Sequence, residues 1–125
     1  MKKYLTSIFI LSLAFFTSCD TSVSVSHLVK IEFEPAEIPF NEFFNVLIEL
    51  DTAHFKNVDL QQMNVEAIMP SHGHGMNVQP IVSPGEKPNS FKASGMLFHM
   101  RGDWEVQVFI KHADKLEKAT LDVTI

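Results

Sequence analysis

Residues 104–111, WEVQVFIK, decide the fold class of this chain. Polar and apolar side chains alternate at the start of the stretch and an apolar run follows, which together are typical of a largely buried β-strand. Trp104 opens this strand, and we expect its side chain to lie in the core beneath the loops. The stretch therefore predicts a domain built from β-strands.

Shorter runs with the same period of two lie on both sides of this strand. They cover residues 29–34, 44–50, 65–69, 91–98 and 121–125, and a weaker run covers residues 77–82. All six prolines fall between the clear runs, where a missing amide hydrogen bond costs least. No segment shows a sustained helical period. Six or seven short strands in about 100 residues predict an all-β fold, an antiparallel immunoglobulin-like β-sandwich.

The first 18 residues have the features of a secretory signal. Lys2 and Lys3 form a short basic head, residues 5–16 are mainly apolar, and small residues follow up to Cys19. An apolar stretch of about a dozen residues is too short for a membrane span, which needs about 20. The segment resembles a bacterial lipoprotein signal, in which the cysteine after the cleavage site is acylated. The alternative is an ordinary signal that leaves Cys19 as a free thiol.

This resemblance divides the chain into three parts. Residues 1–18 are predicted to be the signal peptide, residues 19–26 the lipidated cysteine with a flexible Ser/Thr-rich tether, and residues 27–125 one β-sandwich domain. Several acyl chains would hold the protein firmly to a membrane. We therefore expect a membrane-anchored lipoprotein in an extracytoplasmic compartment, either the periplasm or the cell surface.

Composition argues against several classes of function. The chain has one cysteine, so its lipidation would leave no thiol for a disulfide, a cysteine-ligated zinc or a cysteine nucleophile. The formal net charge is −5, and no basic cluster is present, so we do not expect nucleic-acid binding. No serine or threonine lies in the context of a catalytic nucleophile, and no Gly-rich phosphate-binding turn is present. We therefore do not expect an enzyme.

Residues 69–76, MPSHGHGM, are the segment richest in potential metal ligands. It holds two imidazoles, His72 and His74, and two thioethers, Met69 and Met76. Imidazole and thioether together suit copper, and thioether in particular favours Cu(I). Glycines allow such a loop to fold back so that near neighbours can meet at one point. The segment therefore predicts a copper site, and the alternative is a solvent-exposed polar turn.

A second segment, GMLFHMRGDWEV at residues 95–106, completes a family resemblance. A Met-Pro loop with His, Gly and Met, followed later by a glycine and a Phe-x-Met-x-Gly-x-Trp turn, resembles the YtkA-like domain. That family is a small extracytoplasmic β-sandwich, related in outline to FixH-type proteins of cytochrome oxidase biogenesis. The resemblance implies this fold for residues 27–125 and a role in copper handling.

The second segment also adds two potential ligands from a turn that we expect beside the first. The predicted copper site consists of His72, His74, Met76, Met69, His99 and Met100. Packing in the core is the alternative for Met69, and packing against Trp104 is the alternative for Met100. Met96 alternates with Phe98 within a strand and is expected in the core.

The remaining histidines, His27, His54 and His112, stand alone in the sequence, and no function is predicted for them. Two hypotheses of different kinds follow. The first is a membrane-tethered copper-binding protein that serves copper delivery to an acceptor protein or oxidase assembly. The second is a lipoprotein interaction module in which the His-Gly-Met loop contacts another protein and no metal is bound.

Overall fold

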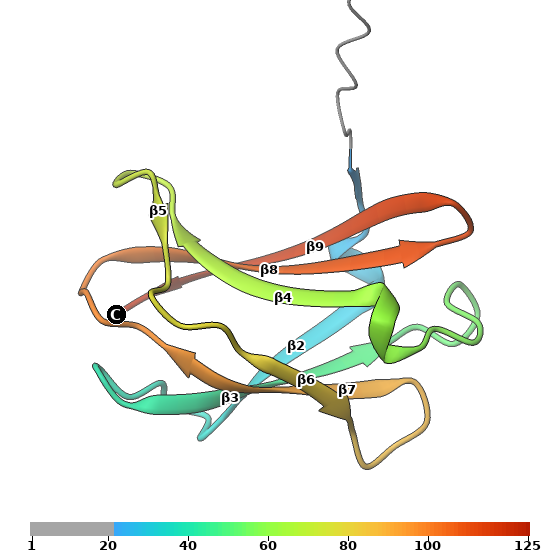
Figure 1. The fold of residues 1–125 in the computed structure, drawn as a ribbon, viewed down its shortest axis with the longest axis horizontal. Helices are drawn as coiled ribbons and strands as arrows, with labels where there is room; N and C mark the ends of the chain where they lie inside the picture. The colour runs from blue at the N-terminus through green and yellow to red at the C-terminus, as the bar shows by residue number, and fades with distance from the viewer. Residues whose placement is uncertain (1–21) are drawn as a thin grey trace, which may run out of the picture.

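The computed structural model describes residues 22–125, which form a sandwich of two β-sheets (Figure 1). In spatial order, the first sheet contains β1 (Val23–Ser24), β9 (Lys115–Thr124), β8 (Asp103–His112), β4 (Met63–Met69) and β5 (His74–Gly75). The second contains β2 (Val29–Glu34), β3 (Phe43–Leu50), β7 (Ser90–Leu97) and β6 (Ile81–Pro84). Neighbouring strands are antiparallel, except that β1 runs parallel to β9. The predicted all-β sandwich is confirmed.

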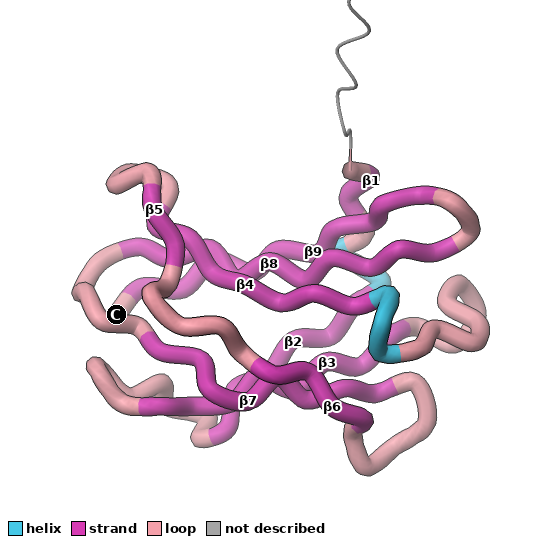
Figure 2. Tube along the Cα trace, in the orientation of Figure 1, coloured by secondary structure: helices cyan, strands magenta, loops and turns pink. Residues whose placement is uncertain are grey.

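Helical structure is confined to two short segments in the part of the chain that the structure covers. These are the 3-10 helices η1 (Ser26–Leu28) and η2 (Leu60–Gln62), drawn in cyan in Figure 2. Within residues 22–125, no helix has the length and apolar character needed to cross a bilayer. The predicted signal peptide and Cys19 lie outside the described residues.

The core lies between the sheets because the strands bury every second side chain. Val65 and Val106 of the first sheet and Val46 and Ala93 of the second belong to one buried cluster and are fully enclosed. Burying an aliphatic side chain of the size of valine or leucine stabilises a fold by about 1.5–3 kcal/mol. Trp104 is 1% exposed, so its predicted place in the core is confirmed.

A β-bulge at Gly95 changes which side chains of β7 face the core. Asn45 of β3 pairs with Ser94 and Phe44 pairs with Met96, so Gly95 is the extra residue. Its φ of +85° is a left-handed conformation that glycine adopts without steric cost. Before the bulge the odd-numbered residues are buried, and after it Met96 and Phe98 are buried. Met96 therefore lies in the core as predicted, and the strand delivers the aromatic ring of Phe98 to the interior.

Two strands differ from the sequence-based expectation by more than two residues at one end. The last strand begins at Lys115 rather than at residue 121. The sequence pattern missed its first half because the inward-facing side chains there include Glu117 and Ala119, which give little hydrophobic signal. The weak strand expected at residues 77–82 lies at β6, which ends with Pro84. A proline is tolerated there because β6 is at the edge of its sheet. The expectation that all prolines lie between strands is therefore wrong for Pro84.

The segment before β2 joins the sandwich earlier than predicted. Val23 and Ser24 pair with Glu117 and Lys118 of β9, and the amide of Val25 donates to the carbonyl of Lys118 at 2.9 Å. Val25 is 3% exposed and belongs to the core. The last residues of the predicted tether are therefore part of the fold.

Candidate metal centre

The His-Gly-Met loop folds back onto the edge of the five-stranded sheet. The amides of His72 and Gly73 donate to the carbonyl of Met69 at 3.1 and 3.0 Å, which closes a tight turn. Gly73 has a φ of +69°, where a side chain would be strained. After this turn β5 pairs with β4, and His74 lies opposite Met69. The predicted return of the loop is therefore present, and part of it is a short strand.

The pairing of β5 with β4 decides where His74 and Met76 point. Residues directly opposite each other in an antiparallel pair lie on the same face of the sheet. Met69 is 0% exposed and Ala67 is 1% exposed, so both face the core. His74 lies opposite Met69, and the amide of Met76 donates to the carbonyl of Ala67 at 3.1 Å. His74 and Met76 therefore point toward the inner face, where both are half-buried.

His99 reaches the same place from the other sheet. It lies just after β7, on the connection that leads to β8 in the five-stranded sheet. Phe98 stacks on Trp104 with ring centroids 4.7 Å apart, and the indole Nε1 of Trp104 donates to the carbonyl of Met100 at 3.0 Å. These two contacts fix the residues on both sides of His99, whose ring centroid lies 5.6 Å from that of Trp104.

Imidazoles from these two segments meet beside Trp104. The ring centroid of His74 lies 5.6 Å from that of His72, 5.7 Å from that of His99 and 6.3 Å from that of Trp104. Nδ1 of His74 lies 3.1 Å from the carbonyl oxygen of Gly75. A carbonyl oxygen can only accept, so this hydrogen bond places a proton on Nδ1, and in the neutral imidazole Nε2 is the nitrogen that can bind a metal. We call His72, His74 and His99 the copper cluster, after the metal that the sequence predicts for them.

Nδ1 of His99 lacks a hydrogen-bond partner although it is buried. It is the one buried side-chain nitrogen or oxygen of this kind within residues 22–125. An unsatisfied buried polar group costs about 1–3 kcal/mol, and such groups are rare in native proteins. Coordination of a metal ion by this nitrogen would remove that cost. This nitrogen and the neighbouring imidazoles of His72 and His74 are therefore candidate ligands, and their rings would have to turn toward a common point to hold one ion.

The methionines of the predicted site divide into two kinds. Met69 is fully buried, and its Cε lies so close to Gly102 that a Cβ there would approach it to 3.0 Å. Packing in the core, the alternative given for Met69, accounts for that position. Met76 and Met100 are half-buried and pack against the core from the same two segments as His74 and His99.

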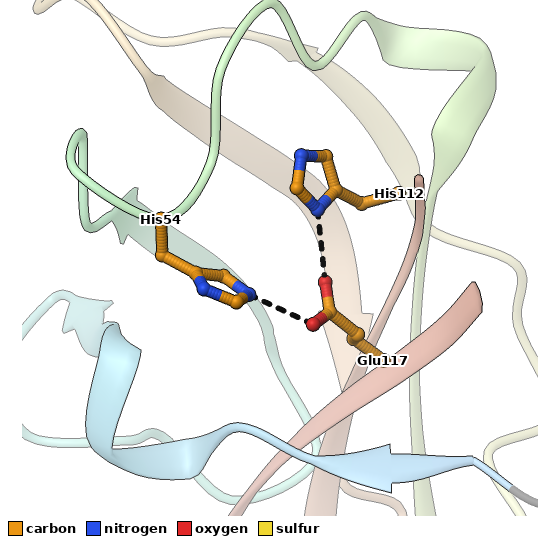
Figure 3. A group of neighbouring side chains, drawn as sticks. All are labelled: His54, His112 and Glu117. Carbon is orange, nitrogen blue, oxygen red and sulfur yellow. Dashed lines mark hydrogen bonds and ion pairs between the residues drawn. The ribbon is translucent and has the colours of Figure 1, made fainter. Parts of the chain in front are cut away.

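A second group of potential ligands lies at the opposite end of β8 (Figure 3). Nε2 of His54 is 2.8 Å from one carboxylate oxygen of Glu117, and Nδ1 of His112 is 3.2 Å from the other. We call these three residues the carboxylate cluster. His54 and His112, which stand alone in the sequence and for which no function is predicted, lie together in space. Sequence reasoning missed the cluster because 63 residues separate His54 from Glu117, and no local motif links them.

Comparison of the sequence with protein-family models and with curated proteins gives no match. The resemblance to the YtkA-like domain therefore depends on the two sequence segments described above and stays a prediction.

Proposed function

We propose that this protein binds copper at the copper cluster, outside the cytoplasm, and passes the ion to an acceptor protein. One observation supports the proposal above the others. His74 on β5 and His99 on the connection from β7 to β8 meet beside Trp104, and Nδ1 of His99 is buried there without a partner. A buried imidazole nitrogen with no protein partner, beside other imidazoles, is a candidate metal ligand.

The ligand chemistry favours copper over zinc. Imidazole suits both ions, but thioether is a soft ligand that selects Cu(I). Met76 lies two residues after His74, and Met100 directly follows His99. Half-burial of these side chains leaves part of each open to solvent. An acceptor's ligands can then attack the bound ion while the donor's ligands leave one at a time. Delivery by ligand exchange needs this partial exposure.

A test of the copper cluster can use the single tryptophan of the chain as its reporter. Cu²⁺ quenches tryptophan fluorescence at short range, so binding beside Trp104 should quench it and saturate at one equivalent. Replacing His74 and His99 together with alanine should weaken binding by at least about 100-fold, because even outer-shell changes cost 10–100-fold. Competition with a colorimetric copper chelator measures the affinity.

The matched control is His27→Ala, which removes an exposed histidine outside both clusters and should leave quenching and affinity unchanged. Affinity should also weaken as pH falls, since an imidazole must lose its proton to coordinate. Met76→Leu should weaken Cu(I) more than Cu(II). Parent-like quenching of Trp104 by Cu²⁺ in the double alanine variant would contradict the proposal and favour the interaction module.

The membrane part of the proposal depends on Cys19. With Cys19→Ala, acylation should be lost, and the protein should leave the detergent-soluble membrane fraction. Fractionation of cells that express the parent and the variant measures this difference. A parent protein that is soluble and carries no lipid would contradict the anchor without affecting the copper site.

A further inference from the structure

We propose that the carboxylate cluster, His54, His112 and Glu117, is a second metal site that takes Zn²⁺. It is independent of the copper cluster, because the two lie at opposite ends of β8. Trp104 and His112 are eight positions apart on this strand, which corresponds to about 26 Å at about 3.3 Å per residue.

The β8–β9 hairpin brings His112 and Glu117 to the inner face of the sheet. Ala113 and Asp114 both have positive φ, so they form the tight two-residue turn whose twist matches the strands. Glu117 pairs with Ile110, which is fully buried, so its side chain shares the inner face. His112 follows Ile110 by two positions and points the same way. Neighbouring strands therefore place both groups at one end of the core.

His54 closes the cluster from the connection between β3 and β4. The carboxylate of Asp51 accepts from the amides of Ala53 and His54 at 2.9 and 3.0 Å, and the amide of Phe55 donates to the carbonyl of Asp51 at 2.9 Å. The turn is therefore held by its own hydrogen bonds. Phe55 is buried beneath it, with its ring centroid 4.6 Å from that of His54 and 5.4 Å from that of His112. Both imidazoles therefore pack against the buried ring of Phe55.

The spacing of the ligand atoms suits a tetrahedral ion. Zinc binds histidine nitrogen at about 2.0–2.1 Å, which places neighbouring ligands about 3.4 Å apart. The two nitrogen–oxygen distances are 2.8 and 3.2 Å, and one ligand atom from each residue lies within 4.8 Å of the other two. Small side-chain shifts would therefore open the space for an ion. Figure 3 shows both imidazoles directed at the carboxylate between them.

Burial and ligand type both point to a divalent ion. Glu117 is the one buried side chain with a formal charge among residues 22–125, and it is 5% exposed. Two imidazoles and a carboxylate are the protein ligands of many zinc sites that leave a fourth position for water. The side chain of His54 keeps 39% of its surface in solvent, so the fourth position can be reached from outside. Without a thioether, this set suits Zn²⁺ better than Cu(I).

The test uses Zn²⁺ and a parent in which His72, His74 and His99 are all alanine, so that the copper cluster cannot contribute. This protein should bind one equivalent of Zn²⁺. Saturation should raise its melting temperature by about 10 °C or more, since the ion binds the folded state alone. Co²⁺ should give the intense visible bands of tetrahedral coordination.

His54→Gln and Glu117→Gln should each weaken Zn²⁺ binding by at least about 100-fold. His54 lies on an exposed turn, so its replacement keeps the test valid if Glu117→Gln disturbs folding. His27→Gln is the control and should bind Zn²⁺ as the parent does. In protein with an intact copper cluster, His54→Gln should leave the quenching of Trp104 by Cu²⁺ unchanged. No stoichiometric Zn²⁺ binding, or parent-like binding by both variants, would overturn the site and leave the copper proposal untouched.

Discussion

The two ends of strand β8 carry histidine clusters that are built alike and stabilised differently. At one end, His99 on the connection from β7 meets His74 of β5. At the other end, His54 on the connection from β3 lies 5.6 Å, between ring centroids, from His112. Each cluster therefore forms where the chain crosses from the four-stranded to the five-stranded sheet.

The difference between the clusters is the carboxylate. Glu117 lies within hydrogen-bond distance of both imidazoles at its end, whereas Nδ1 of His99 has no partner. An ion in the carboxylate cluster would replace interactions that already stabilise the fold. An ion in the copper cluster would give Nδ1 of His99 a partner that the protein itself does not provide. Similar placement in the fold therefore gives one cluster a shared hydrogen-bond acceptor and leaves the other with a buried nitrogen that has no partner.

The largest loss of stability is expected from removing the indole ring of Trp104, which lies beside the copper cluster. Trp104→Ala should lower the free energy of unfolding by about 3–5 kcal/mol, the range for truncating a large buried aromatic. Because the variant has no tryptophan, unfolding in urea should be followed by far-ultraviolet circular dichroism. If the variant stays folded, Zn²⁺ binding about 26 Å away should persist. A loss below about 1 kcal/mol would contradict the burial of Trp104.

The next effect comes from the carboxylate that distinguishes the clusters. Glu117→Leu should cost about 1–3 kcal/mol in the metal-free protein, because two imidazoles lose their shared partner. Glu117→Gln keeps one acceptor oxygen and should cost less. Chemical denaturation in the presence of a chelator measures both. If leucine is tolerated without loss, the carboxylate cluster does not stabilise the metal-free fold.

At His99, in contrast to Glu117, we expect that removing the polar group does not destabilise the metal-free protein. His99→Leu removes a buried nitrogen without a partner, so the metal-free protein should keep its stability or gain up to about 1 kcal/mol. The same variant should lose most of its copper affinity. His112→Leu is the matched change at the other end of β8 and should destabilise. A clear loss of stability for His99→Leu would show that Nδ1 has a partner in solution.

The smallest effect is expected from a carboxylate on the outer face. The ammonium of Lys92, at 2.6 Å, and the amide of Asn45 donate to Glu34 and hold the pKa of this carboxyl below its ordinary value of 4.5. Its stabilisation is therefore present above the unfolded-state pKa and is lost as pH falls through the lower folded-state pKa. Glu34→Gln should lower the melting temperature slightly at pH 7, and the difference should vanish in acid. A drop as large as that of Glu117→Leu would contradict the distinction between buried and exposed carboxylates.

The fold could be predicted because alternation is a local signal. Val65, Val106 and Val108 recur at every second position, and the sheets bury them as expected. The first half of β9 was missed since its inward side chains include Glu117 and Ala119, a charged and a small residue. Glu117, which interrupts the hydrophobic pattern of β9, is therefore also the residue that contacts the two imidazoles. Departures from a hydrophobic pattern are expected at functional sites.

The copper cluster was partly predictable for a similar reason. His72 and His74 share one Gly-rich loop, and His99 directly precedes the turn before Trp104, so a shared end of the sandwich could be inferred. The carboxylate cluster could not be found in this way. His54 belongs to a turn that carries no metal-ligand motif, and its partner on β9 is brought near by tertiary structure alone.

The pairing of Val23 with Glu117 places the start of the described chain beside the carboxylate cluster, which has a consequence if Cys19 carries a lipid. Four residues of chain span at most about 14 Å, so a lipid on Cys19 would keep the carboxylate cluster close to the bilayer surface. The copper cluster lies about 26 Å from the carboxylate cluster along β8. With a lipid on Cys19, the carboxylate cluster would be the nearer of the two to the anchor, and a copper acceptor would have to reach the end of the sandwich that is farther from it.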